Sequence, residues 1–194
     1  YFSMLKDCAQ ILYIPIALDM GTFGYEGCFD WFSTIITTHA NEREIDFTML
    51  MESDEIPDLG KYESVYIGGG NTYKLLDYVY RRGLDKKLVE YINGGGIVYG
   101  GSAGAMIFGK DIRTVEEEKR VEYIHDNGLN LIGGRSVICH YLPEQDEKIF
   151  CTAAKINSDI IALPEDSGLV IDCGGSIHEI VGNAFLFRGS KKEN

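Results

Sequence analysis

Ser102 stands in the setting that most favours chemistry in this chain. Residues 100–104 read Gly-Gly-Ser-Ala-Gly, the pattern G-x-S-x-G, directly after the apolar run at 97–99. Small neighbours allow a tight strand-to-helix turn that exposes one side chain. Backbone N–H groups at the start of the helix then favour an oxyanion. The pattern predicts Ser102 as the nucleophile of an acyl transfer; the alternative is an ordinary turn in which Ser102 only caps the helix.

A second glycine-rich turn follows another apolar run, at residues 64–67. Gly68, Gly69 and Gly70 permit positive φ angles and a close approach of the backbone to a ligand. Such a loop would direct a further N–H group at an oxygen near Ser102. Neither the phosphate-binding pattern G-x-x-x-x-G-K-[ST] nor the dinucleotide pattern G-x-G-x-x-G occurs at this turn, so a nucleotide site is disfavoured.

A serine hydroxyl needs a base, and the chain offers four histidines. His39 follows a predicted helix, His125 lies in a polar stretch, and His178 falls in a late strand. His140 instead ends the strand predicted at 137–140, at the carboxyl edge where the serine is expected. Position therefore favours His140 over the other three histidines, and two interpretations of it stay open: the base of the reaction, or a packed structural histidine.

The base in turn needs a carboxylate that fixes its tautomer. Glu165 follows the strand predicted at 160–163, again at a carboxyl end. Asp166 is adjacent to it, and residues 116–118 are all glutamate. Position favours Glu165 over the other acids of the chain.

An alternating series of strands and helices must position these residues. Apolar runs predict strands, and apolar residues at helical spacing predict helices. We expect strands at 11–17, 45–50, 64–67, 97–100, 137–140, 160–163, 168–172, 177–181 and 184–188, and helices at 24–38, 71–82, 84–92, 103–108 and 145–157. This order predicts an α/β fold with a mostly parallel sheet covered on both faces. The last three strands have the spacing of an antiparallel meander.

Composition limits the class of protein. The 194 residues are 45% hydrophobic and 25% charged, so we expect a single globular domain over 1–194. The formal net charge of −12, with no basic run longer than a pair, disfavours binding to nucleic acids and anionic membrane surfaces. No apolar run approaches the roughly 18–20 residues that span a bilayer. The five cysteines show no C-x-x-C pair, so we expect reduced thiols, no zinc site and a cytoplasmic protein.

Four blocks of the chain, in order, resemble the aspartyl dipeptidase (dipeptidase E) family of serine peptidases. They are residues 66–76, which contain Gly-Gly-Gly-Asn-Thr; 101–114, with Gly-Ser-Ala-Gly-Ala and Asp-Ile-Arg-Thr; 128–141, which end in Cys-His-Tyr; and 163–165, Leu-Pro-Glu. Cyanophycinase shares the serine turn but not its surroundings, and class I glutamine amidotransferases carry Cys in place of Ser102. The resemblance implies a class I glutamine amidotransferase-like fold, a three-layer sandwich with antiparallel strands near the C-terminus.

The resemblance also implies a catalytic role for each matching residue. Ser102 would be the nucleophile, and His140 the general base that later protonates the leaving amine. Glu165 would orient His140. Glu117, which falls where the family offers another acid, is the second choice for that role.

Backbone groups would complete the site that the resemblance implies. The N–H groups of Gly70 and Ala103 would form the oxyanion hole, and Gly69 and Asn71 would contact the substrate. No metal or organic cofactor is implied.

This sequence differs from the aspartyl dipeptidases in a segment that affects substrate specificity, in the residue before His140, and at the N-terminus. The segment 142–155 is shorter than in aspartyl dipeptidases, is acidic (Glu144, Asp146, Glu147), and lacks the Arg suited to a substrate Asp side chain. Because acidic groups repel an acidic side chain, we expect no strict Asp specificity. Cys139 stands where Pro is usual. The family's first strand and its loop are largely missing and the chain begins with Tyr, so we expect a truncated N-terminal strand.

The sequence thus predicts a serine peptidase that hydrolyses short peptides through an acyl-enzyme on Ser102. Two alternatives stay open: a catalytically silent binding or regulatory protein that kept the fold, and an esterase or amidase that uses the same residues. The accepted side chain, endo- or exo-cleavage, and a possible homodimer are left open as well.

Overall fold

The computed structural model describes residues 1–18, 24–41, 43–119, 121–122 and 126–194. Contacts divide the chain into two compact units, residues 1–104 and 105–194, and each is described in turn. The single domain that we expect over 1–194 stays a prediction.

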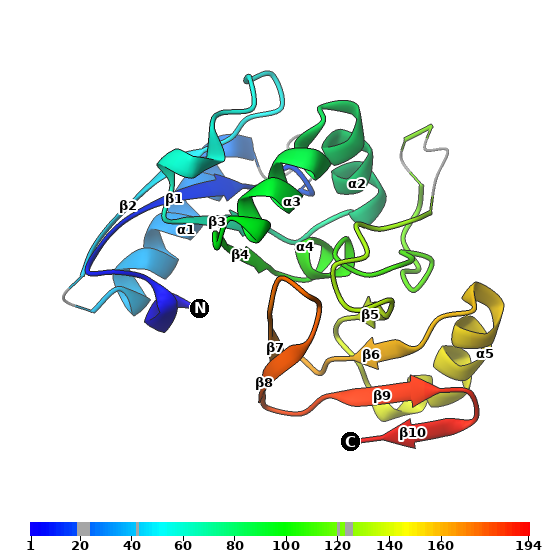
Figure 1. Cartoon of the computed structure of the whole chain (residues 1–194). Helices are drawn as coiled ribbons and strands as arrows, with labels where there is room; N and C mark the ends of the chain where they lie inside the picture. The colour runs from blue at the N-terminus through cyan, green and yellow to red at the C-terminus, as the bar shows by residue number, and fades with distance from the viewer. Residues whose placement is uncertain (19–23, 42, 120, 123–125) are drawn as a thin grey trace. The chain divides into compact units, whose positions relative to one another are not determined.

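The first unit is built on a sheet of four parallel strands in the order β2-β1-β3-β4 (Figure 1). The strands are β1 (Cys8–Ile14), β2 (Glu44–Met49), β3 (Ser64–Ile67) and β4 (Ile97–Gly100). The helices are α1 (Gly24–His39), α2 (Thr72–Arg81) and α3 (Leu84–Asn93), with 3-10 turns η1 (Phe2–Met4) and η2 (Leu59–Lys61). Two residues after β4 lead into a short helix, α4 (Ala103–Met106), whose last two residues belong to the second unit.

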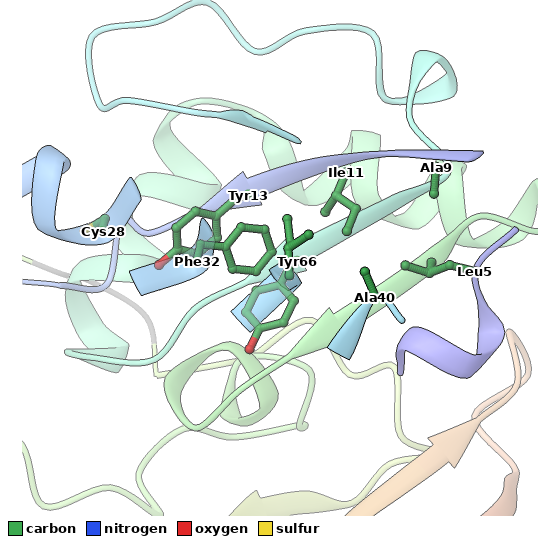
Figure 2. Close-up of a cluster of buried hydrophobic side chains, with 9 residues drawn as sticks. Leu5, Ala9, Ile11, Tyr13, Cys28, Phe32, Ala40 and Tyr66 are labelled. Carbon is green, nitrogen blue, oxygen red and sulfur yellow. The ribbon is translucent and has the colours of Figure 1, made fainter. Parts of the chain in front are cut away.

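Both faces of this sheet are apolar and covered. Ile11 and Tyr13 of β1 belong to a buried cluster with Phe32 of α1, shown in Figure 2. The rings of Tyr13 and Phe32 stack with their centroids 4.2 Å apart. Alternation along the strand turns Leu12 and Ile14, which are fully buried, to the opposite face. Helices α2 and α3 lie on that face (Figure 1), so the predicted α/β sheet covered on both sides is confirmed.

The second unit combines a mixed sheet with a separate hairpin. In the sheet order β10-β9-β6-β5, strands β5 (Ser136–Ile138) and β6 (Ile160–Ala162) are parallel, whereas β9 (Phe185–Arg188) and β10 (Lys191–Glu193) are antiparallel to their neighbours. β7 (Gly168–Ile171) pairs with β8 (Ile177–Val181). After the 3-10 turn η3 (Pro143–Gln145), helix α5 (Asp146–Ile156) packs Ile149 and Ala153 against the core that contains Phe187.

Three predicted elements are placed differently by the structure. The first strand ends at Ile14, because Pro15 has no N–H group for a strand ladder, and it begins at Cys8, which pairs with Glu44. The helix predicted at 103–108 ends at Met106. The predicted three-stranded meander is wrong, because β9 pairs with β6 instead of β8.

Candidate active site

Ser102 lies on a sharp turn between β4 and α4 in the first unit. Its φ angle is +49°, in the left-handed region that costs a residue with a side chain about 1–3 kcal/mol. The Gly101 N–H donates to Ile67 O at 3.0 Å, and the Gly104 N–H donates to Gly101 O at 2.9 Å. A Cβ on Gly104 would lie 2.4 Å from Ile67 O, so only glycine permits this close approach to β3. Ser102 therefore has the strained backbone that the G-x-S-x-G pattern predicts.

The glycine turn after β3 lies directly against Ser102. A Cβ on Gly69 would stand 3.0 Å from the Cβ of Ser102 and 3.7 Å from its Oγ. Gly70 has a φ angle of +136°, and a Cβ there would lie 2.3 Å from the carbonyl oxygen of Ala17. Glycine at position 69 thus keeps the space beside the serine hydroxyl free of a side chain, whereas glycine at position 70 permits the positive φ angle and the close approach to Ala17.

The first unit contains two further candidate site residues, Ala103 and Asn71, and each lies at the start of a helix. Ala103 is fully buried and is the first residue of α4, so its N–H group immediately follows Ser102. The side-chain oxygen of Asn71 accepts a hydrogen bond from the Lys74 N–H at 2.9 Å and caps α2. The position of Asn71 is therefore explained in part by helix capping.

In the second unit, His140 and Glu165 follow two adjacent parallel strands, β5 and β6. Backbone hydrogen bonds continue the pairing beyond the strands: Leu163 N–H donates to Ile138 O at 2.9 Å, and Tyr141 N–H donates to Leu163 O at 3.0 Å. Nδ1 of His140 donates a hydrogen bond to Oε2 of Glu165. The strand register thus brings the predicted base and the first-choice acid together.

A cavity of about 160 Å³ lies within the second unit, beside the segment that carries His140. Its charged walls are Glu116, the second-choice acid Glu117, and Lys148, which forms an ion pair with Glu116. The rest of the wall is polar or apolar: Met106, Thr114, Val115, Ile138, Cys139, Gln145, Ile149, Thr152 and Ile160.

We expected the acidic residues of the segment 142–155 to line the site, but the carboxylates that line the cavity come from another segment. The cavity takes its carboxylates from residues 116–117, which precede His140 in the chain. Asp146 instead forms an ion pair with Lys192 at 2.9 Å. The spacing of residues in the sequence could not predict the position of Glu116 and Glu117 or the pairing of Asp146 with Lys192, because in each case the contacting segments are distant in the chain.

The other histidines lie elsewhere or outside the described residues. The ring of His39 stacks on Phe2 with centroids 5.8 Å apart. His178 on β8 lies 3.2 Å from Asp172, in an exposed pair that the sequence did not predict. His125 lies outside the described residues.

Comparison with known families agrees with these features. The model described as "Peptidase family S51" matches residues 3–180 of the 194. The chain belongs to peptidase family S51. The resemblance to dipeptidase E, inferred from four short blocks, is confirmed by this match and by the relatives below.

Curated relatives of this S51 chain include three bacterial proteins. Peptidase E of Shewanella baltica (strain OS155) is 30% identical over 130 residues, which are 66% of this chain and 52% of the relative. Peptidase E of Streptomyces coelicolor is 36% identical over 69 residues, 36% of this chain and 28% of the relative. An uncharacterized peptidase of Listeria monocytogenes is 32% identical over 102 residues, 50% of this chain and 49% of the relative. The chain spans about half or less of the length of these relatives.

Solved structures share the fold of the S51 chain. A peptidase from an acI-B1 Actinobacterium aligns with a TM-score of 0.66 and 22% identity, covering 95% of this chain and 79% of the other. A protein from Listeria monocytogenes EGD-e aligns with a TM-score of 0.59 and 22% identity, covering 95% and 84%. At this identity the likeness confirms the α/β fold.

Cys139 of the S51 chain precedes His140 and lines the cavity. Burial, and to a smaller extent the Glu165 carboxylate, raises the pKa of its thiol to about 12. The thiol is therefore protonated at neutral pH, and a protonated thiol is a poor nucleophile. Its chemistry does not compete with that expected of Ser102.

The described residues meet the requirements of neither a metal site nor a membrane-spanning helix. Within the described part of the S51 chain, no group of three or more His, Cys, Asp and Glu side chains is arranged to hold a metal ion. None of the described helices combines the length and apolar character needed to cross a membrane.

Proposed function

We propose that this chain is a serine peptidase that hydrolyses short peptides through an acyl-enzyme on Ser102. The observation that carries the proposal is the left-handed Ser102 on the β4–α4 turn, with Gly69 against it. A strained turn of this kind is how a nucleophile is exposed at the end of a strand. Membership of family S51 and the peptidase names of the relatives support peptide hydrolysis as the reaction.

In the proposed reaction, His140 takes the proton from Ser102 Oγ as the hydroxyl attacks the peptide carbonyl carbon. Glu165 accepts the Nδ1 proton in a hydrogen bond, so the other ring nitrogen, Nε2, is the basic one. His140 then protonates the leaving amine. A water molecule, deprotonated by His140, hydrolyses the ester and regenerates Ser102.

The negative charge of the tetrahedral intermediate would be stabilised by the backbone. We assign this role to the N–H groups of Gly70 and Ala103, and removal of one such donor typically costs about 2.7–4 kcal/mol. The absence of a side chain at Gly69, whose Cβ would crowd Ser102, leaves room for the substrate carbonyl group. In this proposal Asn71 contacts the substrate while its side-chain oxygen caps α2.

The charges beside the proposed base argue against strict Asp specificity. Among the described residues that line the cavity, Glu116 and Glu117 are acidic and Lys148, which is paired with Glu116, is basic. An acidic substrate side chain placed there would meet two carboxylates and one ammonium group, and so a net negative charge. Neutral and basic side chains are the better match.

The proposal is tested by replacing Ser102 with Ala and assaying a panel of fluorogenic dipeptides. We expect loss of turnover and of covalent labelling by a fluorophosphonate, with an unchanged circular dichroism spectrum. Ser53→Ala, which changes an exposed serine of the same unit, is the matched control and should keep both. Wild-type turnover by Ser102→Ala would refute the nucleophile.

The same assay separates the alternatives. Absence of labelling and of hydrolysis across a broad peptide library would indicate a silent binding or regulatory protein. Hydrolysis of esters without hydrolysis of amides that carry matched side chains would indicate an esterase. Neither result is expected from the proposed mechanism.

A further inference from the structure

A buried tyrosine directly follows the proposed base. Tyr141 is only 3% exposed, and its hydroxyl donates a hydrogen bond to Oδ1 of Asp146 at 2.6 Å. The hydroxyl oxygen accepts a hydrogen bond from Nζ of Lys192 at 2.5 Å. Nζ of Lys192 also donates to Oδ2 of Asp146 at 2.9 Å. The three side chains thus form a closed hydrogen-bonded triangle.

Aromatic rings hold the cation of this triangle. Nζ of Lys192 lies 4.7 Å from the ring centroid of Phe185, 5.0 Å from that of Tyr141 and 5.6 Å from that of Phe187. Ammonium groups over aromatic faces are attracted by the ring electrons, more strongly when water is partly excluded. The side chains of Lys192 and Asp146 are 27% and 34% exposed, so the triangle is partly shielded from solvent.

The charges of the triangle support one another. Hydrogen bonds to Tyr141 and Asp146 raise the pKa of Lys192. Hydrogen bonds from Tyr141 and Lys192 lower the pKa of Asp146. Ammonium and carboxylate are therefore both ionised at neutral pH, which strengthens the hydrogen bonds to the hydroxyl.

His140 needs an external constraint of this kind. Its φ angle is +57°, an unfavourable conformation that persists only where the surroundings enforce it. Its side chain is 57% exposed and that of Glu165 is 76% exposed, so neither side chain is enclosed in the core of the unit. The next residue, Tyr141, is instead fixed twice, by its N–H bond to Leu163 O and by the triangle at its hydroxyl.

We propose that Lys192, Tyr141 and Asp146 are positioning residues, which hold His140 in the left-handed conformation that directs Nδ1 to Glu165. The expected effect of these residues on turnover rests on the proposed function. Their expected effect on the orientation and tautomer of the His140 ring does not. Lys192 lies on β10, opposite Phe187, and 51 residues separate it from Tyr141. The last strand of the chain therefore contributes to the site, although the family match ends at residue 180.

The first test measures the imidazole itself in Lys192→Met. Long-range ¹H–¹⁵N NMR distinguishes a ring protonated at Nδ1 from one protonated at Nε2, and the His140 signal is assigned from its loss in His140→Gln. We expect the wild type to hold the Nδ1–H form and Lys192→Met to shift towards the Nε2–H form that predominates in free imidazole side chains. An unchanged tautomer in a folded Lys192→Met would overturn the proposal.

The second test measures turnover of a fluorogenic dipeptide. We expect Lys192→Met to lower kcat about 10–100-fold with KM nearly unchanged, because misplacement of a catalytic group by about 1 Å can cost that much. Lys192→Arg, which keeps the charge, should restore most of the loss. Lys191→Met, the same change at a neighbour whose side chain alternates to the other face of β10, is the matched control and should match the wild type.

Two further outcomes keep the inference separate from the proposed function. Tyr141→Phe keeps the aromatic ring and Lys192 but removes the hydroxyl group, so it is the variant to use if Lys192→Met does not fold. A wild-type kcat and a wild-type His140 tautomer in Tyr141→Phe would overturn the positioning role. Wild-type turnover in Ser102→Ala refutes the proposed function alone, because the NMR result still decides whether the triangle positions His140. A fall in thermal stability with unchanged kcat would reduce the triangle to a structural contact.

Discussion

His140 and Glu165 form a hydrogen bond between the ends of two parallel strands, although 25 residues separate them in the chain. The bond joins two largely exposed side chains. Exposed pairs of this kind contribute only about 0–1 kcal/mol to the stability of a fold. Loss of this contact should therefore change the stability of the fold only slightly, so its effect on catalysis can be measured separately.

Replacement of Glu165 by Gln should therefore lower activity far more than stability. The amide loses the negative charge that stabilises the protonated imidazole and can rotate to present a donor, which favours the wrong tautomer. We expect kcat for a dipeptide substrate to fall about 10²–10⁴-fold while the unfolding free energy changes by less than about 1 kcal/mol. Glu117→Gln is the comparison, and a larger loss of kcat in that variant would identify Glu117 as the orienting acid.

Gly104→Ala should destabilise the first unit, because the new Cβ would lie 2.4 Å from the carbonyl oxygen of Ile67. We expect a loss of about 1–3 kcal/mol in urea unfolding, as for other overpacked sites. Gly94→Ala is the matched control: its Cβ would meet its nearest atoms at 3.4 Å and its φ angle is −78°. Equal stability of the two variants would contradict the tight approach between α4 and β3.

The buried thiol of Cys139 should make stability depend on alkaline pH. The thiol has a pKa of about 12 in the folded protein, against the ordinary value of 9.0. Between these values the folded chain binds more protons than the unfolded chain, so stability is unaffected by this group below about pH 9 and falls from there towards pH 12. Compared with Cys139→Ala, the wild type should lose up to about 1.4 kcal/mol per pH unit in that window. Parallel curves of unfolding free energy against pH for the two proteins would refute the shift.

Peptides with Asn should be cleaved faster than otherwise identical peptides with Asp on the acyl side of the bond. The two side chains have nearly the same shape, so the difference isolates the charge that Glu117 would repel. One such repulsion of about 1.4 kcal/mol corresponds to a tenfold difference in kcat/KM. Glu116→Gln, which releases Lys148 from its ion pair, should narrow the ratio. A preference for Asp in the wild type would show that the cavity does not receive this side chain.

The sequence by itself determined the local elements and the blocks that carry the chemistry. The apolar run at 64–67 and the glycines after it predicted β3 and its turn, because burial and backbone freedom are properties of short segments. The G-x-S-x-G pattern predicted the strained Ser102 turn for the same reason. The pairing of strands could not be predicted as well from the sequence. The polar strand β10 (Lys191–Glu193) was not predicted, because only its pairing with β9 makes it a strand.

Only the tertiary structure decided which distant side chains meet. The register of β5 and β6 sets Glu165 rather than Glu117 against Nδ1 of His140. Chain folding likewise brings Lys192 to Tyr141, and Glu116 to Lys148. Such contacts are not encoded in spacing, because a carboxylate or an ammonium has the same chemistry at any position. What selects its partner is the packing of whole elements around the apolar core.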